Sequence, residues 1–269
     1  MMNPAISREF AGILHKARLD RREVPRLTEH LRNLSLLDAY SIMDGGVELR
    51  VRAGERISGL KMGLTSRAKM EQMGLNQPIY GVLTDRMAMR NGDAMDLSTA
   101  IHPKIEPEIA FLFDGGLAGA GERAHTREEV IAACTGVTIA LEILDSRYVG
   151  FKYFSLPDVI ADNASSSHYV LGTWNRTPSA QLDLNQLKLS LCRDGVACEE
   201  ATGSAILGDP WLSVVGLTEI LASRKGMTTT TIPPGTVILA GAATLALPLE
   251  RGHVYSVRAP GFDEVRIRC

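Results

Sequence analysis

The sequence has few cysteines and no excess of charge of either sign. Its four cysteines are scattered and form no Cys-x-x-Cys pair, which argues against both a zinc site and a disulfide framework. The 29 basic and 31 acidic residues leave a formal net charge of −2. A balance that even gives no electrostatic sign of a nucleic-acid partner or of an anionic membrane surface.

The chain also lacks a long apolar run. No segment approaches the roughly 20 apolar residues that a membrane span needs, and residues 1–24 lack the apolar core of a secretory signal. We therefore expect a cytoplasmic protein with no membrane partner. The sequence contains no internal repeat, and 269 residues with 45% hydrophobic content suit one or two globular domains with a sizeable core.

Residues 1–56 are predicted to form an N-terminal helical region, and residues 57–269 a β-rich catalytic domain. Within the first part, Ser7 can cap one helix and Ser35 can cap another. The pair Gly45-Gly46 lies where the second helix should continue. Each glycine costs about 1 kcal/mol relative to alanine in a helix, so we expect a break or a kink at this pair.

From Ile57 onward, short runs typical of strands alternate with turn signals. Residues 189–198 predict a β-hairpin that turns at an Asp-Gly pair. Further strands are expected over residues 236–240, 254–259 and 264–268. Helices are expected after the capping box that begins at Thr126 and from Asp209 to Gly226. Many short strands with few helices predict an α+β fold, and no motif of a doubly wound sheet is present.

Residues 102–113 carry the pattern that most strongly indicates chemistry. Read as a strand, they place Glu106 and Glu108 on one face and apolar side chains on the other. Residues two apart lie roughly 6.5–7 Å apart along a strand, so two long carboxylates can converge on one cation. Pro107 cannot donate to a ladder, which suggests the edge or the start of a strand. Lys104 shares the carboxylate face and could pair with Glu106 or Glu108.

Glu142 is the single acid within the apolar stretch 137–144. Burying such a charge is costly unless it is paired or bound to a metal. Three carboxylates with no histidine or thiol among them select a hard ion such as Mg²⁺ or Mn²⁺. Two plainer interpretations stay open, because Glu106 and Glu108 could form the solvated face of an ordinary strand and a lysine could satisfy Glu142.

Five segments, in this order along the chain, together suggest a family. They are Gly-Leu-Lys-Met-Gly-Leu-Thr-Ser (59–66), Gln-Pro-Ile-Tyr-Gly (77–81), His-Pro-Lys-Ile-Glu-Pro-Glu-Ile (102–109), Leu-Glu-Ile-Leu-Asp-Ser-Arg-Tyr (141–148) and Ala-Asp-Asn-Ala-Ser-Ser (161–166). This pattern resembles the hydratase/decarboxylase branch of the fumarylacetoacetate-hydrolase superfamily from about Ser35 to the C-terminus. The resemblance implies a mixed β-roll or barrel core of that type, and Glu106, Glu108 and Glu142 as the metal ligands.

Two of these segments look more like the decarboxylases of this branch than like its hydratases. Hydratases typically have Asp-Phe where this chain has Ile79-Tyr80, and the missing acid removes a group that could transfer a proton when water is added. Hydratases also typically have Gly-Ser-Arg-Ile where this chain has residues 145–148, Asp-Ser-Arg-Tyr. The resemblance therefore implies decarboxylation of 2-oxohex-3-enedioate to 2-hydroxypenta-2,4-dienoate and CO₂, in aromatic meta-cleavage catabolism.

The resemblance also implies roles for residues around the metal. Lys61 would lie near the carboxylate and the oxo group of the substrate. Arg147 and Lys152, which follow Glu142 closely in the sequence, are candidates for binding the leaving carboxylate. Further substrate contacts are expected from Ser66, Lys152, Asn163 and Ser165. For Arg147 and Lys152, a structural or surface ion pair remains an alternative. For Asn163 and Ser165, a purely structural role in a turn remains an alternative.

Other functions remain open at this point. The chain could be a 2-hydroxypenta-2,4-dienoate hydratase that uses the same metal, or a partner subunit without activity. The acylpyruvate hydrolases of the family are a more distant alternative, because the sequence offers no obvious His–Glu pair to activate water. The family implies a homo-oligomer, and a complex with the pathway hydratase is a further possibility.

Overall fold

The computed structural model describes residues 2–66, 77–152, 155–177, 181–224 and 231–269. Its N-terminal part consists of the helices α1 (Pro4–Asp20), α2 (Leu27–His30) and α3 (Leu36–Arg52). The first strand, β1, begins at Ile57, so helix gives way to strand at the predicted boundary. One buried cluster contains side chains from both parts, and a division into two domains stays a prediction.

The cap of α1 differs from the prediction. Asn3, rather than Ser7, is the N-cap, and its side chain accepts a hydrogen bond from the N–H of Ala5. Pro4 follows at the first helical position, where its missing N–H leaves no hydrogen bond unmade. The predicted cap lies one turn too late because Asn3 and Pro4 already supply the signals for a helix start.

The predicted break at Gly45-Gly46 is wrong, because α3 runs unbroken to Arg52. A Cβ atom on Gly45 would lie only 2.9 Å from the Cβ of Ala11 in α1. Glycine at this position therefore lets the two helices approach closely, and their packing offsets the low helix propensity. The cap of α3 is as predicted, with the Ser35 side chain accepting from the N–H of Asp38.

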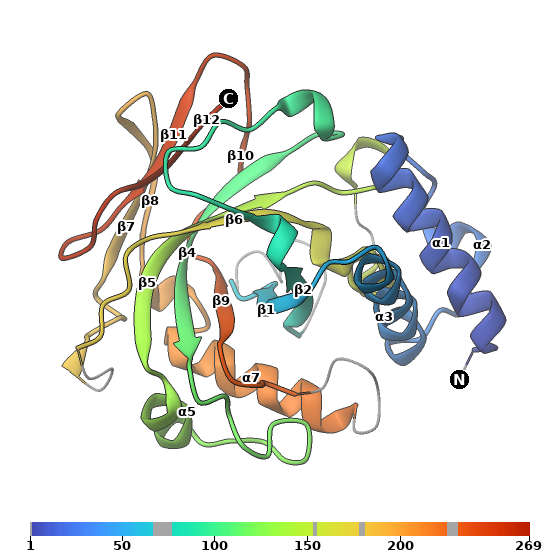
Figure 1. Cartoon of the computed structure of the whole chain (residues 1–269), viewed down its shortest axis with the longest axis horizontal. Coiled ribbons are helices and arrows are strands. Elements are labelled where there is room, and N and C mark those ends of the chain that lie inside the picture. The colour runs from blue at the N-terminus through green and yellow to red at the C-terminus, as the bar shows by residue number, and fades with distance from the viewer. Residues whose placement is uncertain (1, 67–76, 153–154, 178–180, 225–230) are drawn as a thin grey trace.

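A large mixed sheet forms the core of the protein (Figure 1). Its strands lie in the order β2 (Ile79–Thr84), β1 (Ile57–Gly63), β9 (Thr236–Ala242), β4 (Lys104–Phe113), β5 (Gly136–Leu144), β6 (Ser166–Leu171) and β3 (Ala88–Met89), and β10 (Leu247–Pro248) also pairs with β4. The pairs β1–β9 and β3–β6 are parallel, and the others are antiparallel. This sheet curls into a half-barrel, which confirms the expected α+β fold with a mixed β-roll core.

A second, antiparallel sheet packs beside the first. Its order is β12 (Val265–Arg268), β11 (Val254–Arg258), β7 (Lys188–Arg193) and β8 (Val196–Thr202). The strands β7 and β8 form the predicted hairpin, and both turn residues, Asp194 and Gly195, have positive φ as a tight hairpin turn requires. The strands expected near the C-terminus correspond to β9, β11 and β12.

The described residues contain three more helices, α5 (Arg127–Ala133), α6 (Leu156–Ala161) and α7 (Pro210–Ser223). Helix α7 packs on β9, α6 packs mainly against α3, and α5 packs against α7. The predicted capping box starts α5, since Thr126 and Glu129 each accept a hydrogen bond from the backbone N–H of the other. Asp209 caps α7 as predicted. The predicted end of that helix, at Gly226, lies outside the described residues.

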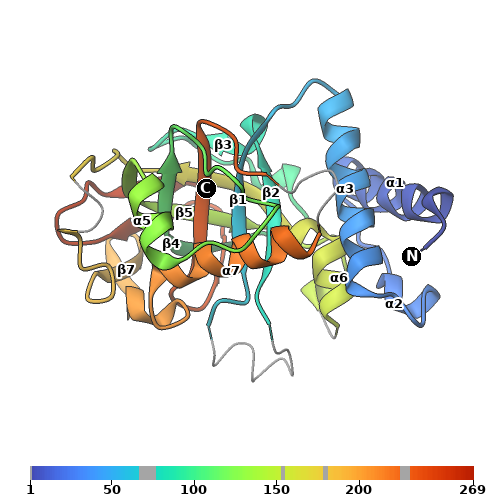
Figure 2. The same ribbon diagram turned by 90° about the horizontal axis from the view of Figure 1, so that it is seen from below.

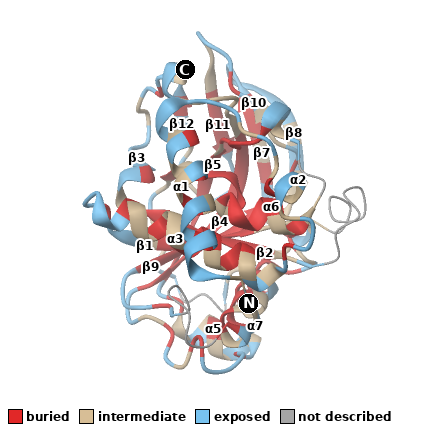
Figure 3. Cartoon of the chain, turned by 90° about the vertical axis from the view of Figure 1, so that its right-hand side faces the viewer, coloured by how far each residue is buried: buried red, intermediate tan, exposed pale blue. Residues whose placement is uncertain are grey.

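The segment Gly203–Ser223 is apolar and long enough to cross a membrane, which the sequence interpretation had not recognised. Half of it is buried inside the protein. Its Trp211 packs on Phe111 of β4 with ring centroids 4.3 Å apart, and α7 lies along the sheet in Figure 2. These contacts are those of a core helix. Figure 3 shows that buried residues are concentrated in the strands.

Candidate metal centre

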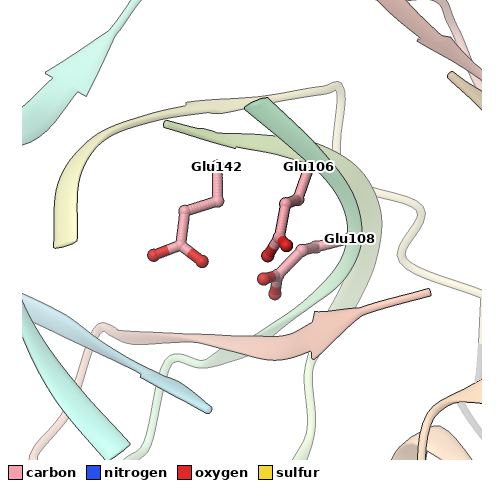
Figure 4. Close-up of side chains that lie close together, drawn as sticks. All are labelled: Glu106, Glu108 and Glu142. Atoms are coloured by element: carbon pink, nitrogen blue, oxygen red, sulfur yellow. The ribbon is translucent and has the colours of Figure 1, made fainter. Parts of the chain in front are cut away.

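Two neighbouring strands position the three glutamates. The strands β4 and β5 pair with Glu106 directly opposite Glu142 and with Glu108 opposite Ala140. Directly opposite residues project to the same face of a sheet, as do residues two apart. One carboxylate oxygen from each glutamate lies within 4.8 Å of the other two, and Figure 4 shows the three groups together. The convergence that the spacing predicts is therefore present.

Pro107 does not mark a strand edge, contrary to the prediction. The strand β4 is paired on both sides, with β5 on one and with β9 and β10 on the other. The Pro107 carbonyl accepts from the N–H of Ala243 at 3.3 Å, in the link between β9 and β10. In an antiparallel strand, the N and C=O of one residue face the same neighbouring strand. The N atom of Pro107 therefore faces the β9 side, where the pairing of β4 with β9 is already irregular.

All three carboxylates are buried. The exposed fractions of Glu106, Glu108 and Glu142 are 7%, 0% and 0%. Burial, reinforced by the charge of Glu142, raises the pKa of Glu108 well above its usual 4.5. Burial also raises the pKa of Glu142, although the neighbouring Lys61 opposes that shift. When no metal is bound, burial therefore favours the protonated form of these two carboxyl groups.

The donor set fits a divalent metal. Glu108 Oε2 accepts from the N–H of Gly241 at 2.7 Å. Glu108 Oε1 and Glu142 Oε1 are buried and have no hydrogen-bond partner among the described residues. A buried carboxylate oxygen without a partner is costly, and a bound cation would satisfy both atoms. Three carboxylates are the ligands that a hard ion such as Mg²⁺ prefers, so Glu106, Glu108 and Glu142 are the residues that would hold it.

Lys61 of β1 supplies a buried cation beside this centre. Its Nζ lies 3.0 Å from Glu142 Oε2 and donates to the carbonyl of Ala164 at 3.2 Å. Burial by itself would lower the pKa of Lys61, but the three glutamates outweigh burial and raise it. Lys61 thus stays protonated. Lys61 is the lysine partner that the sequence left open for Glu142, but it contacts only one of the two carboxylate oxygens.

A cavity of about 580 Å³ opens next to the three glutamates. This volume is in the range of small-molecule sites. Its polar lining comes from Lys61, Thr65, Ser66, Lys104, Glu106, Lys152 and Ser165. Apolar side chains complete the wall, among them Ile79, Leu144, Phe151 and Val159. The arrangement suits a small ligand with anionic ends, because three lysines lie around an otherwise largely apolar space.

The predicted substrate contacts divide into two groups. Ser66, Lys152 and Ser165 all line the cavity, together with Lys61. Of these, Lys152 is exposed, whereas Ser165 is buried and its Oγ has no hydrogen-bond partner among the described residues. These side chains therefore have access to a ligand in the cavity.

Arg147 and Asn163, the other two predicted contacts, lie outside the lining of the cavity. The buried guanidinium of Arg147 pairs with the carboxylate of Asp162. The side-chain amide of Asn163 accepts from the N–H of Val82 at 2.7 Å and donates to its carbonyl at 2.9 Å. Both side chains tie the turn after α6 to neighbouring strands, so the structure favours the structural alternatives.

That turn holds a contact that the sequence interpretation missed. Asn163, Ala164 and Ser165 have φ values of +52°, +49° and +59°. A left-handed conformation costs a non-glycine residue roughly 1–2 kcal/mol, and strain of this kind gathers at functional sites. Here the turn directs the Ala164 carbonyl at Lys61. Residue type gives no signal for such a backbone contact.

Lys104 was also misjudged. Among the described residues it forms no ion pair with Glu106 or Glu108. Its Nζ lies over the ring of Phe151, 4.2 Å from the ring centroid. Phe151 comes from the turn Val149–Phe151 and has a φ of +53°, which is rare for a bulky residue. A cation and an aromatic ring thus meet on the cavity wall.

Comparisons with known proteins agree with this geometry. The family model of the fumarylacetoacetate (FAA) hydrolase C-terminal region matches residues 61–268. The chain is 38% identical to a 4-oxalocrotonate decarboxylase of Pseudomonas sp. (strain CF600), over 99% of each chain. It is 32% identical to a 2-keto-4-pentenoate hydratase of Paraburkholderia xenovorans (strain LB400), over 98% of this chain and 95% of that one.

A solved structure extends the likeness to the fold. It is the 4-oxalocrotonate decarboxylase from Pseudomonas putida G7 complexed with magnesium and adipate, with a TM-score of 0.91 and 36% identity over 100% of this chain and 98% of that one. The same enzyme has also been solved with calcium and acetate. On these grounds the chain belongs to the fumarylacetoacetate hydrolase family.

Proposed function

We propose that the protein decarboxylates 2-oxohex-3-enedioate, also called 4-oxalocrotonate, to 2-hydroxypenta-2,4-dienoate and CO₂. The observation that carries this proposal is the buried centre of Glu106, Glu108, Glu142 and Lys61. Two of these residues, Lys61 and Glu106, line a cavity of about 580 Å³. Its support is the likeness, over the whole chain, to the 4-oxalocrotonate decarboxylases.

The metal is proposed to be Mg²⁺, with Mn²⁺ as a substitute, held by Glu106, Glu108 and Glu142. The magnesium in the related decarboxylase structure supports this choice. When bound, the ion would act as a Lewis acid toward the 2-oxo end of the substrate. The carboxylates must be deprotonated to serve as ligands, so metal binding releases protons from the centre.

The reaction needs no organic cofactor, because the 2-oxo group of the substrate accepts the electrons. The C5–C6 bond breaks as C6 leaves as CO₂, and its electron pair passes through the C3=C4 double bond to the C2 oxygen. That oxygen takes up one proton to give the 2-hydroxy product. We assign Lys61 to this oxygen or to the adjacent carboxylate, because its ammonium is buried, charged and at the cavity.

Substrate contacts are proposed for Ser66, Lys152 and Ser165, which line the cavity. Arg147 and Asn163 are left out of this set because Asp162 and Val82 occupy their side chains. Ser165 is the best placed of the three, since its Oγ is buried and lacks a partner among the described residues.

Hydration of 2-hydroxypenta-2,4-dienoate is the competing function, since the hydratases are also relatives. Ile79 argues against it. Its buried side chain lines the cavity at the position where hydratases typically have an acid. An isoleucine cannot transfer a proton to or from water, so the cavity lacks that candidate group for hydration.

The test follows both substrates with one preparation. With Mg²⁺, CO₂ release from 2-oxohex-3-enedioate is expected, and EDTA should abolish it. Glu106→Gln should lower the rate at least about 100-fold, because it removes one anionic ligand, while Glu9→Gln on the exposed face of α1 should leave it unchanged. Consumption of 2-hydroxypenta-2,4-dienoate without CO₂ release from the other substrate would make the protein a hydratase, and full activity of Glu106→Gln would refute the ligand assignment.

The remaining proposals concern assembly and location. We propose a cytoplasmic homo-oligomer that can associate with the hydratase of the same pathway, because that enzyme would consume the product. Light scattering on the purified protein, alone and mixed with the hydratase, tests both. A monomer that does not change mass in the mixture would contradict them.

A further inference from the structure

The strand β4 orders three side chains by depth along one face. Lys104 is half-buried, Glu106 is 7% exposed and Glu108 is fully buried. Lys104 and Glu106 line the cavity, and Leu144, opposite Lys104 across the β4–β5 pair, lines it too. The cavity therefore has an inner end at the carboxylates and an outer end at Lys104.

The ammonium of Lys104 lies on an aromatic ring and has no carboxylate partner among the described residues. Its contact is the ring of Phe151 at 4.2 Å, and among the described residues no carboxylate lies within ion-pair distance of it. The ring of Phe151 also meets His102 edge to face, with centroids 5.2 Å apart. The N–H of the preceding Gly150 donates to Glu23 at 2.6 Å, which ties this turn to the N-terminal region. A cation on an aromatic ring keeps its N–H groups free to bind an anion.

The backbone spacing along β4 is comparable to the length of the substrate. Alternate residues on a strand lie roughly 6.5–7 Å apart, which is the step from Glu106 to Lys104. The two carboxyl carbons of an extended six-carbon diacid lie roughly 6 Å apart, given carbon–carbon bonds of about 1.5 Å. A diacid whose 2-oxo end lies at the glutamates thus brings its other carboxylate to the outer end of the cavity.

We propose that Lys104, supported by Phe151, binds the distal carboxylate of the substrate, the one that leaves as CO₂. This inference rests on the proposed function for the choice of a diacid. A single ammonium on a flexible stem orients a carboxylate less firmly than a buried, two-pronged arginine would. Such a contact suits decarboxylation, because a group that held the negative charge too tightly would stabilise the substrate against losing it.

The experiment measures binding rather than turnover. Calorimetry on the Mg²⁺-loaded protein compares 2-oxoadipate, a saturated diacid of the same length, with 2-oxohexanoate, which lacks the distal carboxylate. The wild type should prefer the diacid. Lys104→Met should weaken diacid binding at least about tenfold, the usual loss for a hydrogen bond to a charged group, and leave the monoacid unchanged. Lys104→Arg should retain the preference, and Lys16→Met on α1 serves as the surface control.

Three results would overturn the inference. They are a wild type without preference for the diacid, a Lys104→Met variant that keeps the preference or weakens both ligands equally, and transfer of the whole effect to Lys152→Met. Neither ligand has the double bond that decarboxylation uses. Loss of the preference in Lys104→Met would therefore support the role of Lys104 even if the wild type releases no CO₂. Conversely, CO₂ release would support the proposed function even if Lys104→Met keeps the preference.

Discussion

At the residue scale, the centre is a cluster of buried charges that only partly balance one another. Lys61 brings one positive charge to three glutamates, and among the described residues it lies within ion-pair distance of Glu142 alone. Burial is the main cause that raises the pKa of Glu108 and of Glu142, and the negative charge of neighbouring glutamates adds to the shift. A bound divalent cation would favour the deprotonated form of the same two groups.

This gives a pH dependence of stability. The folded pKa of Glu108 and Glu142 is raised, so the folded metal-free protein binds more protons than the unfolded chain, and its free energy of unfolding falls as pH rises from the usual 4.5 through the folded values. In EDTA, we expect the melting temperature to fall as pH rises above the usual carboxyl pKa of 4.5, and saturating Mg²⁺ to remove part of that fall.

Glu108→Gln is the matched variant for this prediction. It keeps the size of the side chain but has no proton to lose, so its melting temperature in EDTA should depend less on pH than that of the wild type. Differential scanning calorimetry across the pH series measures both proteins. Equal slopes for the variant and the wild type would show that Glu108 does not titrate in this range.

The alternation of β4 and β5 is enough to predict the glutamates from sequence. A period of two places Glu106 and Glu108 together, and an acid among apolar residues identifies Glu142. Arg147 and Asn163 were predicted as substrate contacts, but their side chains bind Asp162 and Val82, which a turn and a distant strand place beside them. Residue type shows that a side chain can bind an anion, but not whether the protein already occupies it.

At the element scale, the turn Asn163–Ser165 joins the metal centre to the rest of the sheet. Three consecutive left-handed residues are unusual, and only tertiary contacts can maintain them. Here the contacts are the Asn163 amide on Val82 and the Lys61 ammonium on the Ala164 carbonyl. The sequence predicted a polar loop here, but the handedness depends on these partners.

Ala164 gives a direct test of the turn. Glycine adopts positive φ without penalty, so Ala164→Gly should keep activity and change the free energy of unfolding by no more than about 1 kcal/mol in either direction. Valine is branched at Cβ and should lower the free energy of unfolding by at least about 2 kcal/mol at this buried position. Urea denaturation measures both, and equal stability of the two variants would contradict the left-handed turn.

At the scale of the whole molecule, the N-terminal helices are fastened to the β core by buried polar contacts. Arg224, at the end of α7, pairs with Asp44 of α3 at 2.7 Å. Its guanidinium also lies 4.2 Å from the ring centroid of Tyr40, which stacks on Tyr80 of β2 at 5.1 Å. Because 180 residues separate Asp44 from Arg224, this ion pair could not be predicted from the sequence, whereas the change from helix to strand near residue 56 could.

Arg224→Met should destabilise the protein strongly. Removing one partner of a buried ion pair leaves the other charge uncompensated and typically costs about 3–5 kcal/mol. The exposed pair of Lys16 and Asp20 is the control, and Lys16→Met should change the free energy of unfolding by less than about 0.5 kcal/mol. A small effect of Arg224→Met in urea denaturation would mean that the packing of the helices does not depend on the ion pair of Arg224 with Asp44.

The central claim is that Glu106, Glu108 and Glu142 together bind the catalytic metal. Anomalous scattering from a crystal grown with Mn²⁺ tests it most directly. The account predicts one strong anomalous peak, in contact with a carboxylate oxygen of each of the three glutamates, and its loss in Glu142→Gln crystals. A peak bound elsewhere, or no peak in a wild-type crystal saturated with Mn²⁺, would contradict it.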